Sequence, residues 1–513
     1  MRMLGARNCS SEHVPADSQR GAPMKRIHRT ALSLAAAAAM PMAGTVLAEE
    51  TLPLKSVNKA GEIIDAAIAA YGGEETIENL KTVARQSTFT TWATNQSRKP
   101  GPPWDEGAQS TLQAIDLENG VYASRQAGDA GGFEFDTTVV IDGEEGWNVD
   151  YRAGTVTDNP NADFNTASGP FVRVTAPLLV RQLMERRQTS HWLGEADVDG
   201  RPHDIITLVM EVGPGLALYF DRETHLLSRS ERVLPPFGQV DYRFLDYTTI
   251  DGIPFASTFK LLVNDQPNIT IDYSSTQVNQ PIAQFAALPD DFERVEGAAQ
   301  PTEMVLEEFE EGVFLAGANG TYAMFVEMDD HVVAVGATAG IADRIEALRE
   351  AGVDKPIRHA VLTHHHNDHL VGVKDYEAEG ATLYTVAENE SVVRDNAEDG
   401  DTLDLVFVED RLVFESGDRR VEIIDLGPTP HVEHLLVAWL PEEGVMFEAD
   451  HFPNPPNGRM VPANSNTRAL AAAIEREQLD VRYIVGAHSP RVAPIADLHT
   501  ALGLTSRVKT AGL

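Results

Sequence analysis

Apolar residues between positions 56 and 80 recur at helical spacing and then stop at two adjacent glycines. Ile63, Ala67 and Ala70 lie three or four positions apart, so they share one face of a helix. Gly72 and Gly73 follow directly, and a second short apolar segment comes after them. Glycine pairs of this kind end helices. The pattern therefore predicts one helix before the glycines and a shorter one after them.

Short apolar segments separated by turn residues dominate the next two hundred positions. Strands are predicted at 204–212, 215–221, 225–233, 239–247, 255–263 and 269–275. The turn residues Asp221-Arg222-Glu223-Thr224 join two of them as a hairpin. A helix predicted at 177–187 interrupts the strands and is expected to cover one side of their sheet. The region from 49 to 290 thus reads as a mostly antiparallel β domain with helices.

The pattern changes after a segment rich in acidic residues, alanine and proline. We predict a linker at 291–303, where apolar periodicity is lost. Beyond it, a strand at 331–336, a helix at 339–352 and a strand at 357–363 follow one another. Alternation of strands with helices is typical of α/β domains. The second domain is therefore expected to span 304–513 and to be of the α/β class.

Charge and the first 48 residues change this picture in two ways. The chain has 513 residues, with 41 Lys and Arg against 78 Asp and Glu, a formal net charge of −37. Such a balance argues against nucleic acid as a partner. Residues 24–48 combine a basic start, a short apolar run and small residues ending at Ala48. This is the pattern of a signal peptide cleaved after Ala48, not of an integral membrane span. We therefore expect residues 1–48 to be a leader and the protein to be periplasmic or secreted.

A cluster of metal-capable side chains follows the strand predicted at 357–363. The sequence from Thr363 to Leu370 reads THHHNDHL. His364 and His366 are placed to converge on one ion, and Asp368 and His369 on a second. The only cysteine, Cys9, lies in the predicted leader, so imidazole and carboxylate are the available ligands. They suit Zn²⁺, with Fe or Mn as alternatives. Considered by itself, this cluster could also be a set of surface histidines that bind metal adventitiously.

The spacing His-x-His-x-Asp-His at 364–369 resembles the signature of the metallo-β-lactamase superfamily. Two later segments resemble that family in the expected order, LGPTPHVEHLLVAWLPEEGVMFEAD at 426–450 and IVGAH at 484–488. The resemblance covers roughly 303–500 and implies a four-layer αββα sandwich. It also implies a site for two metal ions. The implied ligands are His364, His366 and His431 for the first ion, Asp368, His369 and His488 for the second, and Asp450 between them.

The third histidine departs from the family pattern. Where the family has Gly-His-Thr-Pro-Gly-His, this chain has Gly-Pro-Thr-Pro-His at 427–431. His431 lies 19 residues before Asp450, as the resemblance leads one to expect, so we prefer it to His434. His365 is expected to pack rather than to bind metal. Two residues are candidates for proton transfer: Asp368, as a ligand that also shuttles protons, and His451.

The first domain resembles, more loosely, the lipoprotein-carrier-like half-barrels of the bacterial envelope. The segments that carry this resemblance are AAIAAYGGEETIENLK, VIDGEEGWNV, LALYFDRETHLLSR and FLDYTTIDGIPFAS, within about 56–285. In such a fold a concave sheet holds an acyl chain or another hydrophobic group. A plain β domain that supports its neighbour is the alternative.

These observations predict an exported hydrolase that uses two metal ions, with two Zn²⁺ per chain expected. Its substrate would be a small molecule, and the bond cleaved would be an amide, lactone, ester or thioester. If that molecule is hydrophobic, the first domain could help to bind it. Two alternatives are an iron-dependent oxidoreductase of the same fold and a non-catalytic periplasmic protein that binds lipid or lipoprotein. Substrate, metal and oligomeric state are left open by the sequence.

Overall fold

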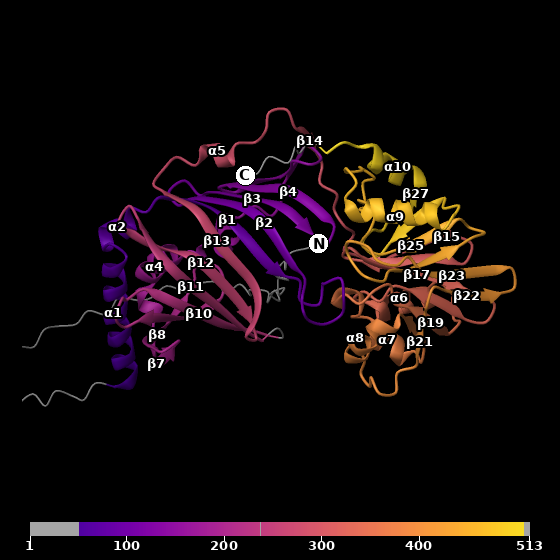
Figure 1. Ribbon diagram of the computed structural model, residues 1–513, viewed down its shortest axis with the longest axis horizontal. Coiled ribbons are helices and arrows are strands. Elements are labelled where there is room, and N and C mark those ends of the chain that lie inside the picture. Colours follow the sequence, from indigo (N-terminus) through magenta and orange to yellow (C-terminus); the bar gives the residue numbers. More distant parts are fainter. Residues whose placement is uncertain (1–50, 236–237, 507–513) are drawn as a thin grey trace, which may run out of the picture. The chain divides into compact units, whose positions relative to one another are not determined.

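The structure is a computed structural model that describes residues 51–235 and 238–506. The predicted leader and signal peptide, residues 1–48, lie outside the described residues. Two regions follow along the chain, a β-rich region and an α/β region (Figure 1).

A single sheet of fourteen strands forms the β-rich region. Its order is β14-β6-β5-β4-β3-β2-β1-β13-β12-β11-β10-β9-β8-β7, and neighbouring strands are antiparallel except for the parallel pair β14 and β6. The strands are β1 (Thr82–Trp92), β2 (Glu106–Asp116), β3 (Val121–Ala130), β4 (Phe133–Asp142), β5 (Glu145–Asp150), β6 (Thr155–Asp158), β7 (Trp192–Val198), β8 (Arg201–Val209), β9 (Gly215–Asp221), β10 (Leu227–Leu234), β11 (Gly238–Ile250), β12 (Ile253–Val263), β13 (Gln266–Val278) and β14 (Glu293–Val295). The predicted hairpin at Asp221–Thr224 is confirmed as the turn between β9 and β10.

Helices pack on this sheet, among them the two predicted before and after the glycines and the one predicted at 177–187. The helices are α1 (Leu52–Ala70), α2 (Glu74–Glu78), α3 (Phe164–Arg173), α4 (Ala176–Glu185) and α5 (Ala283–Ala286). The predicted glycine stop is confirmed, because Gly72 and Gly73 adopt positive φ angles of 100° and 92° between α1 and α2. Ile64 of α1, Leu179 of α4 and Phe255 of β12 meet in one buried core. That core holds α1 to α4 against one face of the sheet, whereas α5 packs near Ala84 and Ala114, whose side chains belong to a separate cluster.

Two facing sheets form the α/β region. The first has the order β15-β16-β17-β18-β19-β20-β21 and the second β22-β23-β24-β25-β26-β27. Their strands are β15 (Val305–Glu310), β16 (Val313–Ala318), β17 (Thr321–Glu327), β18 (Val332–Val335), β19 (Ile357–Val361), β20 (Thr382–Thr385), β21 (Leu405–Phe407), β22 (Arg411–Ser416), β23 (Arg419–Asp425), β24 (Leu436–Leu440), β25 (Val445–Glu448), β26 (Tyr483–Gly486) and β27 (Ala493–Pro494). Buried residues of both sheets, such as Met324 and Phe447, form the core between them.

Helices cover the outer faces of these two sheets. They are α6 (Ile341–Glu350), α7 (Val373–Ala378), α8 (Glu390–Asp395), α9 (Ser465–Arg476) and α10 (Ile495–Gly503). Ile345 and Tyr376 pack α6 and α7 on the first sheet, and Leu470 and Leu498 pack α9 and α10 on the second. Figure 1 shows α9 and α10 on one side of the sheets and α6, α7 and α8 on the other. The predicted αββα layering is confirmed.

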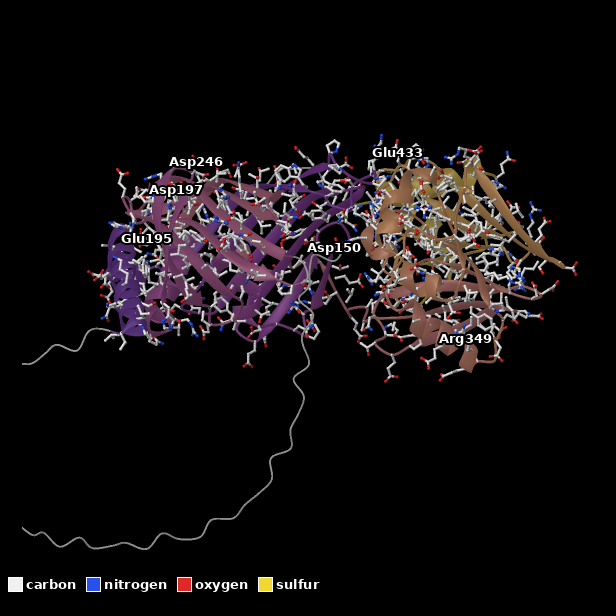
Figure 2. All side chains as sticks on the ribbon, turned by 90° about the horizontal axis from the view of Figure 1, so that it is seen from below. Asp150, Glu195, Asp197, Asp246, Arg349 and Glu433 are labelled. Carbon is white, nitrogen blue, oxygen red and sulfur yellow. The ribbon has the colours of Figure 1, made fainter. Side chains whose placement is uncertain are left out.

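The segment predicted as a linker is not wholly irregular. Residues 293–295 form β14, which adds a parallel edge strand beside β6. Elsewhere in the β-rich region, acidic side chains lie exposed at Glu195, Asp197 and Asp246 (Figure 2). Within the described ranges, none of the helices has the length and apolar character needed to cross a membrane.

Candidate metal centre

The histidine cluster lies on a loop at the carboxyl end of β19. This strand is paired in parallel with β18 and β20, and such strand ends are common places for active sites in α/β folds. Within this loop, residues Asn367–His369 form one turn of 3-10 helix. This turn places His369 close to His364, with ring centroids 4.3 Å apart.

Four side chains form a first group of candidate metal ligands. They are His364, His366, His431 and Asp450, and each offers an atom within 4.8 Å of the others. His431 comes from the connection between β23 and β24, and Asp450 from the loop after β25. Three loops that are distant in sequence therefore meet at one point. The histidines of this group are buried, which favours tight coordination over adventitious surface binding.

A second group lies next to the first and contains Asp368, His369 and His488. His488 follows β26, so the second sheet contributes to both groups. All seven residues predicted as ligands are thus brought together. His434, the alternative to His431, belongs to neither group and bonds instead through Nδ1 to Asp425 Oδ2 at 2.6 Å.

The Asp450 carboxylate lies between the two groups. Its Oδ2 is 3.3 Å from His364 Nε2, 3.2 Å from His431 Nε2 and 2.9 Å from His369 Nε2. Its Oδ1 is 2.9 Å from His488 Nε2. Burial raises the pKa of Asp450, but the neighbouring His369 and His488 outweigh burial and hold that pKa well below its usual range. Asp450 is therefore ionised and touches both groups.

The backbone of Asp450 is also unusual, with a φ of 66°. This left-handed conformation is uncommon for residues other than glycine, although aspartate and asparagine tolerate it best. Strained positions of this kind cluster at functional sites because the surrounding structure must hold them in place. The conformation turns the carboxylate between the histidines of the two groups.

Hydrogen bonds fix which nitrogen of His366 is available to a metal. His366 Nε2 donates to the carbonyl oxygen of Ser97 at 2.9 Å, since a carbonyl can only accept. Burial, together with the nearby His431 and His365, holds the pKa of His366 well below its usual range, so the ring is neutral. Nδ1 then carries the lone pair. That atom is buried and has no hydrogen-bond partner among the described residues.

His488 gives a complementary signal. Its Nδ1 donates to the carbonyl of Gly320 at 3.0 Å, while its Nε2 faces Asp450. Desolvation lowers the pKa of His488, but the Asp450 carboxylate outweighs it and raises that pKa to about 9. Without a metal, a proton on Nε2 must separate this nitrogen from the carboxylate. A divalent cation meets the same need, and binding it would release the proton.

The donor set and its geometry fit divalent metal ions. Neutral imidazoles and ionised carboxylates are ligands for Zn²⁺ and for Fe or Mn. The unpartnered, buried Nδ1 of His366 would be costly if it were merely structural, and several imidazole nitrogens converge on Asp450 as the ligands of a shared cation would. The cluster is therefore a candidate binding site for divalent metal.

The remaining histidines and a buried acid surround this site. His365 Nε2 donates to the Ser97 carbonyl at 2.9 Å and lies outside both groups, in keeping with the packing role expected for it. His451 is fully buried, and its Nδ1 lies 2.8 Å from the carbonyl oxygen of Ala449. This burial does not favour contact with a substrate, so its role as a proton donor stays a prediction. Burial raises the pKa of Glu448, next to this loop, to about 8.

Two residues near the ligands were not predicted from the sequence. Gln96 and Ser97 belong to the β-rich region, yet both contact the histidine loop. Gln96 Nε2 donates to Asp368 Oδ1 at 2.9 Å, and the Ser97 carbonyl bonds to two histidines as described. These contacts join residues about 270 positions apart, and neither residue stands out in the local sequence pattern.

Part of the chain is similar to proteins of a known family. The family model described as the metallo-beta-lactamase superfamily matches residues 318–488. Among solved structures, a metallo-beta-lactamase from Pontibacter korlensis is 20% identical, covers 39% of this chain and 98% of its own, and has a TM-score of 0.31. The metallo-beta-lactamase FIM-1 from Pseudomonas aeruginosa in its mono-zinc form is 21% identical, with coverages of 40% and 97% and a TM-score of 0.31. The search of curated proteins found no match.

A further similar structure is that of a sulfatase. The stereoselective inverting sec-alkylsulfatase Pisa1 from a Pseudomonas species is 16% identical, covers 39% of this chain and 40% of its own, and has a TM-score of 0.31. The family match, which lies wholly within the α/β region, confirms the resemblance of the C-terminal half to the metallo-β-lactamase superfamily.

Proposed function

We propose that this protein is an exported hydrolase that depends on two divalent metal ions, with zinc as the expected metal. His364, His366 and His431 would hold the first ion and Asp368, His369 and His488 the second, with Asp450 between them. The observation that carries the proposal is the convergence of these seven side chains in two adjacent groups. When bound, two such ions polarise a substrate oxygen and make water a stronger nucleophile near neutral pH.

The protein's own residues would perform the remaining tasks. Asp450 is held ionised, so it offsets the charge of two ions with one carboxylate. Asp368 is about half exposed, and Gln96 fixes its Oδ1, which leaves Oδ2 facing His369 at 3.6 Å. A carboxylate at the border between buried ligands and solvent is placed to pass a proton to the leaving group. This supports the role of Asp368 as ligand and proton shuttle.

The substrate class follows from the electrophiles that such a site attacks. We propose a small molecule with an amide, lactone, ester or thioester bond. The acidic surface of the chain disfavours polyanionic substrates such as nucleic acid at long range. The predicted signal peptide supports a periplasmic or secreted location, which cell fractionation of the full-length protein tests.

Metal removal provides the first test. We expect about two zinc ions per purified chain and hydrolysis of at least one member of a panel of β-lactam, lactone, ester and thioester reporters. Dialysis against a chelator is expected to abolish that activity, because both the polarising charge and the activated water are lost. Adding Zn²⁺ back should restore it, and a mock-dialysed sample is the control.

Three results would contradict the proposal. Hydrolysis that persists in a metal-free sample would show that the metal does not act in the reaction. Iron in the purified protein together with dioxygen consumption would favour an oxidoreductase. A chain that turns over no reporter but carries co-purified lipid would favour a binding protein.

A further inference from the structure

The connection between β1 and β2 is longer than the hairpin requires. Trp92 and Glu106 are paired, and the Ala93 amide donates to the Asp105 carbonyl at 3.0 Å. Two residues would suffice to join Ala93 to Asp105 in a tight hairpin. The chain instead inserts residues 94–104. We call residues 93–105 the β1–β2 loop. Long ordered loops at sheet ends are often functional.

Hydrogen bonds within the loop hold the Ser97 carbonyl in a fixed place. The Ser97 hydroxyl donates to the Ala93 carbonyl at 2.9 Å and accepts from the Asp105 amide at 2.8 Å. The Arg98 amide donates to Asp105 Oδ2 at 2.7 Å. Ser97 itself is 2% exposed. The carbonyl between Ser97 and Arg98 is therefore set by contacts on both sides, as a preorganised acceptor must be.

The fixed carbonyl accepts from two adjacent imidazoles of the α/β region. His365 Nε2 and His366 Nε2 each lie 2.9 Å from Ser97 O, which satisfies both of its lone pairs. Only one of these rings belongs to the candidate ligand groups. For His366 the bond selects the tautomer with the proton on Nε2 and aims Nδ1 at the first group.

The neighbouring residue reaches the second group. Gln96 Nε2 donates to Asp368 Oδ1 at 2.9 Å and to Asn367 Oδ1 at 2.6 Å. The Asn367 amide in turn donates to the Asn95 carbonyl at 3.4 Å. The loop thus contacts one candidate ligand of each metal ion. Asp368 is the more exposed of the two, so a single hydrogen bond has a larger share in fixing its orientation.

Two further contacts anchor the loop beside His431. Arg98 Nε donates to the Thr429 carbonyl at 3.0 Å, and its Nη2 pairs with Glu433 Oε2 at 3.0 Å. The Glu433 amide donates back to the Arg98 carbonyl at 2.8 Å. Figure 2 labels Glu433 on the α/β region. The Arg98–Glu433 ion pair is partly exposed and contributes little to stability by itself. The hydrogen bonds to backbone atoms fix how the two segments lie against each other.

The turn between β3 and β4 makes a second contact next to His431. Phe133 packs edge-on against the His431 ring, with centroids 5.2 Å apart. Asn466 Nδ2 donates to the Gly131 carbonyl at 2.8 Å. A side chain at Gly132 would meet Asn466 Oδ1 at 2.3 Å, so only glycine allows this approach. Both contacts lie next to a candidate metal ligand.

We propose that the β1–β2 loop is a positioning element of the metal centre, so that the β-rich region completes the site of the α/β region. Ser97, through its carbonyl, orients His366 for coordination by Nδ1. Gln96 orients Asp368 towards the second ion. This inference rests on the metal binding put forward under the proposed function. It adds that full metal affinity requires residues outside the α/β region.

The expected effect is a loss of metal affinity rather than of fold. Groups that orient metal ligands through hydrogen bonds typically change affinity by about 10- to 100-fold when they are removed. Loss of the Ser97 carbonyl should lower the metal affinity of the first site, because His366 then loses the hydrogen-bond acceptor that keeps its proton on Nε2. Loss of the Gln96 amide should weaken the second site alone. A merely structural contact would lower the melting temperature without separating the two sites.

Two variants of the full chain test this. In the first, Asn-Gly replaces residues 94–104, which restores a two-residue hairpin between Ala93 and Asp105. The second is Gln96→Ala, which leaves the loop intact. Lys99→Ala, at an exposed position in the same loop, is the matched control. Zinc affinity of each is measured by competition with a chromophoric chelator, the cobalt absorption spectrum reports each site's geometry, and circular dichroism reports folding.

The outcomes separate this inference from the proposed function. Wild-type protein and Lys99→Ala should bind both zinc ions with the same affinities. The short hairpin, which lacks both Ser97 and Gln96, should weaken both ions, whereas Gln96→Ala should weaken the second ion alone, each by about 10- to 100-fold. If both folded variants bind zinc like the wild type, the inference is wrong and the metal site stands. If the wild type binds no metal, the proposed function fails first. Should the short hairpin not fold, Gln96→Ala alone decides, and unchanged affinity at its second site overturns the inference.

Discussion

Replacing Asp450 with alanine is expected to remove the capacity for two metal ions and to lower hydrolysis by on the order of a thousandfold. The reason is geometric, because one carboxylate lies within 3.3 Å of Nε2 atoms from both ligand groups. Without it, several imidazoles lose their shared anion, and two cations would lie close together without compensation. Metal content by mass spectrometry and turnover of an active reporter check this.

Asparagine at the same position separates charge from shape. Asp450 has a φ of 66°, a conformation that asparagine tolerates about as well as aspartate and alanine does not. Asp450→Asn should therefore keep the melting temperature close to that of wild type while still losing metal. If both variants retain two ions per chain and full activity, Asp450 is not shared between the ions and the proposed ligand set is wrong.

The second large effect concerns two adjacent histidines with opposite expected behaviour. His364→Ala should abolish binding of the first metal ion and reduce turnover by on the order of a thousandfold, because a ligand is lost. His365→Ala should keep both ions, because its ring lies outside both groups and donates to the Ser97 carbonyl. Loss of that bond should lower the free energy of unfolding by about 1–2 kcal/mol.

The pair is its own control, since both rings are buried and lie next to each other in sequence. Measuring zinc stoichiometry and the urea unfolding midpoint of both variants distinguishes a metal ligand from a packing residue. Equal loss of metal in both variants would show that the whole loop, and not the identity of one ring, controls binding. Retention of the first ion in His364→Ala would contradict its assignment as a ligand.

Local patterns predicted the elements that depend on neighbouring residues. The helix ending at Gly72 and Gly73 was predictable because its apolar spacing and its stop are both local. The helix α3 was not predicted, because Gly169 and Pro170 resemble a turn in the sequence. In the structure Asp163 caps α3 by accepting from the Thr166 amide, and the proline is tolerated inside it. Local breakers were here overridden by capping and by the burial of Phe171.

In the candidate site, too, some residues were predictable from local sequence and others were not. The ligand cluster was predictable because its spacing at 364–369 is local and later segments resemble the superfamily in order. Gln96 and Ser97 were not predictable, because an amide and a backbone carbonyl leave no sequence pattern. These two residues contact the candidate ligands only because the folded sheet places the β1–β2 loop next to the histidines of the α/β region. The preference for His431 over His434 came from its separation of 19 residues from Asp450, and the structure places His431, not His434, among the candidate ligands.

The contact between the β1–β2 loop and the histidines also constrains the order of folding. Ser97 and His365 are 268 residues apart, and closing a loop of that length costs about 5 kcal/mol of chain entropy. The contact is therefore expected to form after each region has built its own core. If the ligand set is as proposed, the histidine run, which needs no such closure, would meet a metal ion before the loop docks. Docking of the loop would then fix the His366 tautomer and strengthen the binding of that ion.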